Sequence, residues 1–214
     1  PHFDLVIHDA QPGHTASASL EDVAACKRIV IATPVQVIGE VATALAPLVQ
    51  PGTRIYDVGS VKLRPLQAMR ETLPDHCEIV GTHPLFGPQS AVTGLKGLPI
   101  VLCPSNGEDV SCERDFLAER LKLDVHVSDA DTHDRTMARV QGLTHLVAKV
   151  ITEIDATPAA YTTRSYDLLM EAAGLVSQDS DALFRAIEKH NPYSRELRER
   201  FFESVETLSK RLED

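Results

Sequence analysis

Two kinds of hydrophobic pattern divide the chain near residue 128. Before it, short runs rich in β-branched residues alternate with stretches in which apolar residues recur every three or four positions. The short runs predict strands and the longer stretches predict helices. The predicted strands are 3–8, 28–32, 54–58, 79–81, 99–102 and 124–127, and the predicted helices between them are 34–48, 63–73 and 109–121. Such alternation predicts an α/β fold, with a mostly parallel sheet covered by helices on both faces.

After residue 128 the pattern predicts helices only. Ser128, with Asp131 three residues later, is expected to cap a long helix that runs to Ile154, before Pro158 interrupts the pattern. Shorter helices are predicted at 168–176 and 183–187. A last helix is expected to open with Asn191 as its cap and Pro192 in its first turn. Its apolar stripe is Leu197, Phe201, Val205, Leu208 and Leu212. A helical unit this small is expected to bury some of its apolar stripes against a partner.

Composition narrows the range of possible partners. The 214 residues suffice for one or two domains, and a hydrophobic fraction of 43% is ordinary for a globular protein. A net charge of −10 argues against nucleic acid or an anionic membrane as partner. There is no apolar run of the ~20 residues that a membrane span needs, and no basic-then-apolar leader. The four cysteines have neither zinc-like nor disulfide-like spacing, so we expect reduced thiols, no metal and a cytoplasmic location.

The strongest candidate for chemistry is His83. It lies in the segment 81–88, Gly-Thr-His-Pro-Leu-Phe-Gly-Pro, directly after a predicted strand. An imidazole accepts or donates a proton near neutral pH, and the flanking prolines and glycines would make a rigid loop. The alternative is a surface turn with an incidental histidine.

A second block strengthens the case for a site. Residues 57–62, Asp-Val-Gly-Ser-Val-Lys, follow the predicted strand 54–58 and precede a predicted helix. In open α/β sheets, ligands bind beyond the carboxyl ends of the strands. We therefore expect Ser60 and His83 to lie on neighbouring loops at that edge.

With a third block, these segments resemble a known family. His133-Asp134, then Gln141, then Thr144-His145 follow in order. Together the three blocks resemble the prephenate and arogenate dehydrogenases of tyrosine biosynthesis, and the likeness extends from Phe3 to the C-terminus. Residues 191–192 and the charged helix after them are most similar to the arogenate-type members.

The resemblance implies oxidative decarboxylation of prephenate or arogenate with hydride transfer to a nicotinamide cofactor. His83 is then expected to be the base, with Ser60 hydrogen-bonded near the same substrate hydroxyl. Lys62 would lend positive charge, although a solvated lysine at a helix start is equally compatible. His145 would bind substrate, although a core histidine is the alternative. Gln141, one turn earlier, is expected to line the same pocket.

The remaining pair of the third block, His133 and Asp134, is interpreted as structural or interdomain. The family resemblance also implies a homodimer built through the helical part. We accordingly expect a Rossmann-like dinucleotide-binding domain at 1–128 and a helical dimerisation and substrate-binding domain at 129–214.

The expected cofactor site lacks one part. No GxGxxG turn occurs, Gly13 is isolated, and residues 11–14 have the composition of a turn. Residues 3–9 nevertheless resemble the second strand of a dinucleotide fold, with Asp9 where the ribose-binding carboxylate belongs. This carboxylate favours NAD, with NADP as the alternative. Thr33 and Pro34 are the other candidate cofactor-binding residues. Either an N-terminal βα unit precedes these residues or the phosphate loop has been lost.

The substrate stays open between prephenate and arogenate. Many prephenate-specific members carry an arginine where this chain has Gly174. Arg135, Arg139 and Arg164 are candidate substitutes for binding the substrate carboxylate. Two other classes of protein are also compatible with the sequence. One is a β-hydroxyacid-type dehydrogenase with a lysine-centred site, and the other is a non-catalytic binding protein.

Overall fold

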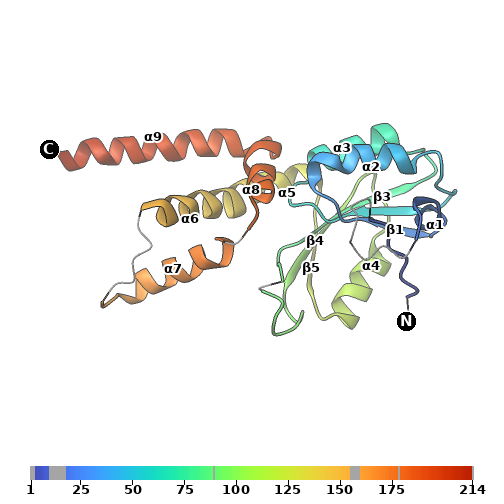
Figure 1. Ribbon diagram of the computed structural model, residues 1–214, viewed down its shortest axis with the longest axis horizontal. Helices are drawn as coiled ribbons and strands as arrows, with labels where there is room; N and C mark the ends of the chain where they lie inside the picture. The colour runs from blue at the N-terminus through green and yellow to red at the C-terminus, as the bar shows by residue number, and fades with distance from the viewer. Residues whose placement is uncertain (1–2, 10–17, 89, 155–159, 178, 214) are drawn as a thin grey trace.

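The computed structural model describes residues 3–9, 18–88, 90–154, 160–177 and 179–213, and its centre is a five-stranded sheet (Figure 1). The strands lie in the order β1-β2-β3-β4-β5. All neighbouring pairs are parallel except β3 and β4, which are antiparallel. The strands are β1 (Arg28–Ile31), β2 (Arg54–Asp57), β3 (Glu78–Pro84), β4 (Pro99–Pro104) and β5 (Asp124–Val127). The expected mostly parallel sheet is therefore confirmed.

Alternating strand residues supply two cores, one on each face of the sheet. Ile55 and Ile79 belong to the larger core, whereas their neighbours Tyr56 and Val80 belong to the smaller one. Since successive side chains of a strand point to opposite faces, this division follows directly from the sequence. The larger core also contains Leu66 and Met69 of the helix after β2.

Helices cover both faces, as the alternating pattern predicts. In Figure 1, α2 and α3 lie on one side of the sheet and α4 lies on the other. The helices of this part are α1 (Leu20–Ala24), η1 (Val35–Val37), α2 (Ile38–Leu45), α3 (Leu63–Thr72), α4 (Ser111–Asp115) and the π-helical turn η2 (Phe116–Arg120).

The predicted strand at 3–8 is wrong. The described residues 3–9 form no regular element, and Phe3 and Leu5 are 65% and 77% exposed. The alternating apolar pattern is present, but no described strand lies beside it, and a strand needs a neighbour to satisfy its backbone groups. Instead Ile7 O accepts from Ala18 N at 3.1 Å, and the Phe3 ring meets Phe116 edge-on. The turn predicted at 11–14 lies outside the described residues.

Strand β3 is longer than predicted. It continues through His83 to Pro84, because residues 80–84 pair with 100–104 of the antiparallel strand β4. His83 therefore lies in a strand, not in the loop that its prolines and glycines suggested. Its pairing with Val101 of β4 fixes its backbone more firmly than a loop would.

The regular elements of the described residues after β5 are all helices, and they extend away from the sheet in Figure 1. The elements are α5 (Ala130–Met137), the π-helical turn η3 (Ala138–Gly142), α6 (Leu143–Ile154), α7 (Arg164–Val176), α8 (Asp181–Arg185), the π-helical turn η4 (Ala186–His190) and α9 (Ser194–Glu213). The division into domains at residue 128 stays a prediction, and Pro158 lies outside the described residues.

Two predicted helix starts are wrong by one or two residues. Asp129, not Ser128, caps α5, because its carboxylate accepts from Thr132 N at 2.8 Å. Helix α9 begins at Ser194, while Asn191 accepts from Tyr193 N in the turn before it. Within the described part of the chain, no helix is both long and apolar enough to cross a membrane.

Candidate active site

The carboxyl ends of β2 and β3 bring two of the predicted blocks together. Asp57 pairs in register with Gly81, so Ser60 and His83 follow at the same edge of the sheet. Both are buried, at 6% and 4% exposure. The Ser60 hydroxyl has no hydrogen-bond partner among the described residues. Since buried hydroxyls are nearly always bonded, this one is available to a ligand.

Lys62 forms a buried ion pair beneath this edge. Its Nζ lies 2.5 Å from Asp57 Oδ2 and donates to Thr82 O at 2.7 Å, and neither charged side chain is exposed. The solvated-lysine interpretation is therefore wrong. The ammonium thus connects Asp57 of β2 with Thr82 of β3, and its positive charge lies close to His83. Direct binding of substrate by Lys62 stays a prediction.

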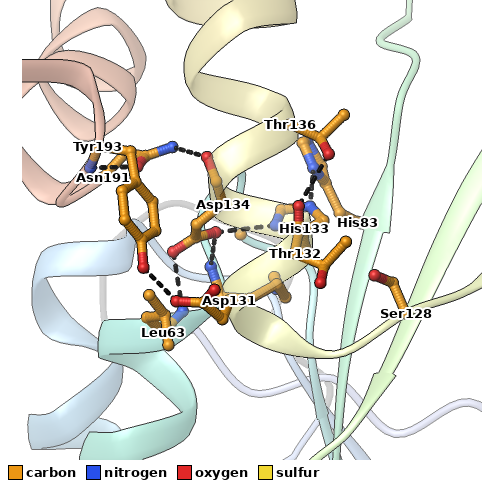
Figure 2. A network of polar contacts seen from close by, with 12 residues as sticks. Leu63, His83, Ser128, Asp131, Thr132, His133, Asp134, Thr136, Asn191 and Tyr193 are labelled. Carbon is orange, nitrogen blue, oxygen red and sulfur yellow. Dashed lines mark hydrogen bonds and ion pairs between the residues drawn. The ribbon is translucent and has the colours of Figure 1, made fainter. Parts of the chain in front are cut away.

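His83 stands at one end of a chain of three side chains from two parts of the protein (Figure 2). Its Nδ1 lies 2.9 Å from His133 Nε2, and His133 Nδ1 lies 2.8 Å from Asp134 Oδ1. His133 is 3% exposed and Asp134 is fully buried. Helix α5 thus places a buried histidine in contact with His83 and a buried carboxylate in contact with that histidine.

Asp134 also joins the helical part to the sheet. Its carboxylate accepts from Lys62 N at 2.7 Å and from Leu63 N at 3.0 Å, at the start of α3. A carboxylate at a helix N-terminus is stabilised by free N–H groups and by the helix dipole. Asn191 Nδ2 donates to Asp134 O at 2.8 Å. The expectation that Asp134 has an interdomain role fits these contacts.

Gln141 reaches the other nitrogen of His83. Its Nε2 lies 3.4 Å from His83 Nε2. Gln141 belongs to η3, and a π-helical turn of this kind is frequent at functional sites because it shifts the register of the side chains. Residues 133 and 141 of one continuous helical segment therefore both contact His83.

The surroundings of His83 keep its ring neutral. Burial lowers the pKa of His83 well below its ordinary value of 6.5, and the positive charge of Lys62 lowers it further, with a smaller contribution from His133. Both causes disfavour the imidazolium form. A neutral imidazole is the form that can accept a proton.

His145 lies one turn beyond Gln141 but faces a different neighbour. Its Nε2 lies 3.1 Å from Asp179 Oδ2, and its Nδ1 is buried without a partner among the described residues. The ring lines a cavity of about 120 Å³ between α6, α7 and α8, together with Lys149, Val176 and Phe184. The pKa of His145 is lowered by burial, although Asp179 opposes the shift. Gln141, not His145, makes the described contact with His83.

Thr33 and Pro34, two of the candidate cofactor residues, lie at the same edge of the sheet. Thr33 follows β1, and its Oγ1 is buried without a hydrogen-bond partner among the described residues. Pro34 comes next and precedes η1. Asp9 ends the described segment 3–9 and is half-buried. Because ligands of open α/β sheets bind beyond the carboxyl ends of the strands, the Thr33 hydroxyl is placed where a ligand can reach it. No glycine-rich turn between a strand and a helix occurs in the described ranges.

The candidate arginines do not converge on His83. Arg135 Nε donates to Asp131 Oδ2 at 2.7 Å, and its guanidinium stacks 4.2 Å from the centre of the Tyr193 ring, whose hydroxyl also donates to Asp131. Arg139 and Arg164 are exposed on η3 and α7.

The sequence interpretation missed the contact between His133 and His83. It treated His133 and Asp134 as structural or interdomain because both were expected in the first turn of a helix, where a carboxylate is stabilised by the helix dipole. The available signal was the pair itself, since a histidine beside a carboxylate can orient a second titratable group. Its target lies 50 residues away in sequence, so spacing alone does not reveal it.

The chain is similar in sequence to proteins of one known family. The sequence profile of a family described as prephenate dehydrogenase, nucleotide-binding domain, matches residues 8–123, which is more than half of the chain. A probable arogenate/prephenate dehydrogenase of Methanocaldococcus jannaschii is 28% identical over 192 residues, covering 85% of this chain and 42% of that protein. Arogenate dehydrogenase 2, chloroplastic, of Arabidopsis thaliana is 32% identical over 168 residues, covering 75% of this chain and 46% of that protein.

The chain thus spans less than half the length of these two relatives. Among solved structures, prephenate dehydrogenase of A. aeolicus in complex with hydroxyphenyl propionate and NAD+ superposes with a TM-score of 0.66 at 20% identity. The match covers 91% of this chain and 72% of that one. At 20% identity, this structural likeness shows that the two chains share a fold and shows nothing further.

Proposed function

This chain belongs to the prephenate dehydrogenase family, and we propose that it catalyses the oxidative decarboxylation of prephenate or arogenate in tyrosine biosynthesis. The observation that carries the proposal is His83. It is a buried, neutral imidazole at the carboxyl end of a strand, with one nitrogen bound to His133 and the other near Gln141. Such a group can act as a general base near neutral pH.

In the proposed reaction, His83 takes up one proton from the substrate and later returns it to the product. A bound nicotinamide would supply the oxidant by taking hydride from C4 of the ring. His83 Nε2 takes the proton of the 4-hydroxyl as the C4–O bond becomes a carbonyl. The bond between the ring and its carboxylate then breaks, CO₂ leaves, and the electron pair makes the ring an aromatic phenolate. His83 returns its proton to the phenolate oxygen and ends the cycle neutral.

The low pKa of His83 has two effects on this cycle. Burial and Lys62 keep the free ring unprotonated, and they also make the imidazolium a strong donor to the phenolate. General-base catalysis of this kind is typically worth 10²–10⁴-fold in rate, roughly 3–5 kcal/mol. Ser60, whose hydroxyl is buried and unpartnered, is proposed to hydrogen-bond near the same substrate oxygen.

We propose NAD as the cofactor. Thr33 and Pro34 would hold the nicotinamide end, and Asp9 would accept hydrogen bonds from the ribose hydroxyls and repel the 2′-phosphate of NADP. The free hydroxyl of Thr33 supports this placement. Asp9→Ser should narrow the preference for NAD over NADP, measured as the ratio of kcat/KM values. A wild-type protein that uses NADP better would show that Asp9 has another role.

We further propose a homodimer formed through the helices after β5, in a cytoplasmic protein. The support is the apolar stripe on α9, where Val205, Leu208 and Leu212 are exposed. Monomers rarely leave a continuous apolar stripe in water. His145 and Gln141 are proposed to bind the substrate on the helical side of the site.

A spectrophotometric assay for NADH tests the proposal. The protein is incubated with NAD and either prephenate or arogenate, and the aromatic product is identified separately. We expect turnover with at least one substrate and a loss of roughly 10²-fold or more in His83→Asn. Binding of the substrates without turnover, measured by calorimetry, would instead favour a non-catalytic binding protein.

A further inference from the structure

We infer that His133 is a positioning residue that fixes the tautomer of His83, so that the lone pair of His83 Nε2 stays free to take the substrate proton. The inference rests on the proposed role of His83 as the base. It assigns a function to a residue of α5 that would not itself touch the reacting atoms.

The order of donors is set at the carboxylate end of the chain. Asp134 accepts from Lys62 N at 2.7 Å and from Leu63 N at 3.0 Å, so both of its oxygens already act as acceptors. An ionised carboxylate has no proton to donate. The contact of 2.8 Å between His133 Nδ1 and Asp134 Oδ1 therefore places the His133 proton on Nδ1.

The tautomer of His83 follows from that of His133. A neutral His133 with its proton on Nδ1 has a bare Nε2, which can only accept. The contact of 2.9 Å to His83 Nδ1 then requires a proton on that Nδ1. A neutral His83 is left with a bare Nε2, and the amide of Gln141, whose Nε2 lies 3.4 Å away, can donate to it. Figure 2 shows the contacts that connect His83 to His133 and His133 to Asp134.

The charged groups around the pair already have partners. The nearby ammonium is that of Lys62, which is bound to Asp57. The carboxylate of Asp134 is held by two N–H groups and by the positive end of the helix dipole at the N-terminus of α3.

The arrangement has the logic of a catalytic triad with one extra imidazole. A carboxylate that orients a histidine base also stabilises the imidazolium formed when the base takes a proton. Here the group that orients the base is His133, which Asp134 holds in turn. Without it, His83 Nδ1 loses its acceptor, both tautomers become populated, and only the fraction with a bare Nε2 can act.

Two substitutions of similar size separate positioning from packing. His133→Gln keeps a carbonyl oxygen close to the place of Nε2, whereas His133→Leu fills the space without an acceptor. Asp134 is unsuitable for this comparison, because its carboxylate also holds α3. Long-range ¹H–¹⁵N NMR of the chain without cofactor reports which nitrogen of each neutral ring carries a proton. The chain has nine histidines, so His83→Asn and His133→Gln serve to assign the signals.

We expect His83 and His133 each to carry the proton on Nδ1 in the wild type at pH 7.5. His83 should keep that tautomer in His133→Gln and lose it in His133→Leu. In the NADH assay, kcat should fall about tenfold or more in His133→Leu, with KM little changed, and recover in His133→Gln.

A wild-type His83 protonated on Nε2, a doubly protonated His133, or an unchanged His83 tautomer in His133→Leu would each overturn the inference. The NMR measurement needs no turnover. The expected tautomers in a protein without dehydrogenase activity would therefore refute the proposed function and leave the positioning geometry intact.

Discussion

Gly81 leaves the space through which the Lys62 side chain reaches Asp57. A Cβ at Gly81 would lie 2.8 Å from Lys62 Cδ and 3.2 Å from Leu66 Cδ1. The aliphatic part of Lys62 thus packs directly against the backbone of β3. The glycine of the predicted loop is needed for close packing and not for a turn.

Gly81→Ala should destabilise the protein by about 1–3 kcal/mol, since the added methyl group overpacks a buried region. Gly174→Ala is the matched control, because a Cβ there meets nothing within 4 Å and the residue lies inside helix α7. That control should be neutral or stabilising by up to about 1 kcal/mol. Urea unfolding measures both changes, and equal effects of the two substitutions would contradict the packing argument.

Lys62→Met should cost about 3–5 kcal/mol of unfolding free energy, because it leaves the buried Asp57 carboxylate without its counter-charge. The double variant Lys62→Met with Asp57→Asn should recover most of the loss. Urea unfolding of the three proteins tests the coupling. Additive losses in the double variant would show that the two side chains act independently.

His83→Asn should lower kcat by roughly 10²-fold or more with little change in KM. The wild-type kcat should decline at acid pH as His83 is protonated. Because the pKa of His83 is lowered well below 6.5, the decline should lie below the ordinary range of histidine, not within it. A pH–rate profile measures this decline. An unchanged acid limb in the variant would place the base elsewhere.

The same shift makes stability depend on pH. The folded-state pKa of His83 is lower than its unfolded value, so the unfolded chain binds more protons between the two values. The contribution of His83 to the free energy of unfolding is therefore fully present above about pH 6.5. It is lost as the pH falls toward the folded-state pKa. Urea unfolding from pH 7.5 to pH 5 should therefore show a smaller loss in His83→Asn than in the wild type.

His145→Ala should raise KM more than it lowers kcat, if the imidazole holds substrate equally in the ground and transition states. Asp179→Asn is the control for the pair that the two residues form. It removes the charge beside His145 and leaves the ring in place. Steady-state kinetics and urea unfolding belong together here. Lost stability with an unchanged KM would identify a core histidine.

Leu208→Glu should convert the expected homodimer into a monomer at micromolar concentration. Leu208 is 53% exposed on the apolar stripe of α9, and a carboxylate there would be buried without a partner on association. Ser209→Glu, the next residue along the helix, is the matched control and should remain dimeric. Light scattering distinguishes the two states. A wild-type protein that is monomeric at this concentration would contradict the dimer prediction.

The sheet was predictable because its strands carry strong local signals. Ile55 and Ile79 lie among apolar neighbours, and the helix patterns between the strands are clear. The segment 3–9 has an equally good alternation, but strand formation depends on a neighbouring strand, which the local sequence does not report. For the same reason the end of β3 was misplaced, since its pairing with β4 lies about 20 residues away.

The candidate site was predictable as a set of residues but not as an arrangement. Motif order placed Ser60 and His83 at one edge of the sheet, and the parallel register agrees. The burial of Lys62 and the contact between His83 and His133 depend on tertiary packing. Side chains that meet across 20 to 50 residues leave no periodic trace in the sequence.

The position of Asp134 has a consequence for motion. The amides of Lys62 and Leu63 are satisfied by a residue of the helical part, so they can exchange with solvent only when that part lifts from the sheet. The same lifting removes His133 from His83. Hydrogen exchange at two backbone amides therefore reports how often His83 loses its contact with His133, and a swing of the helical part away from the sheet would break that contact until the swing is reversed.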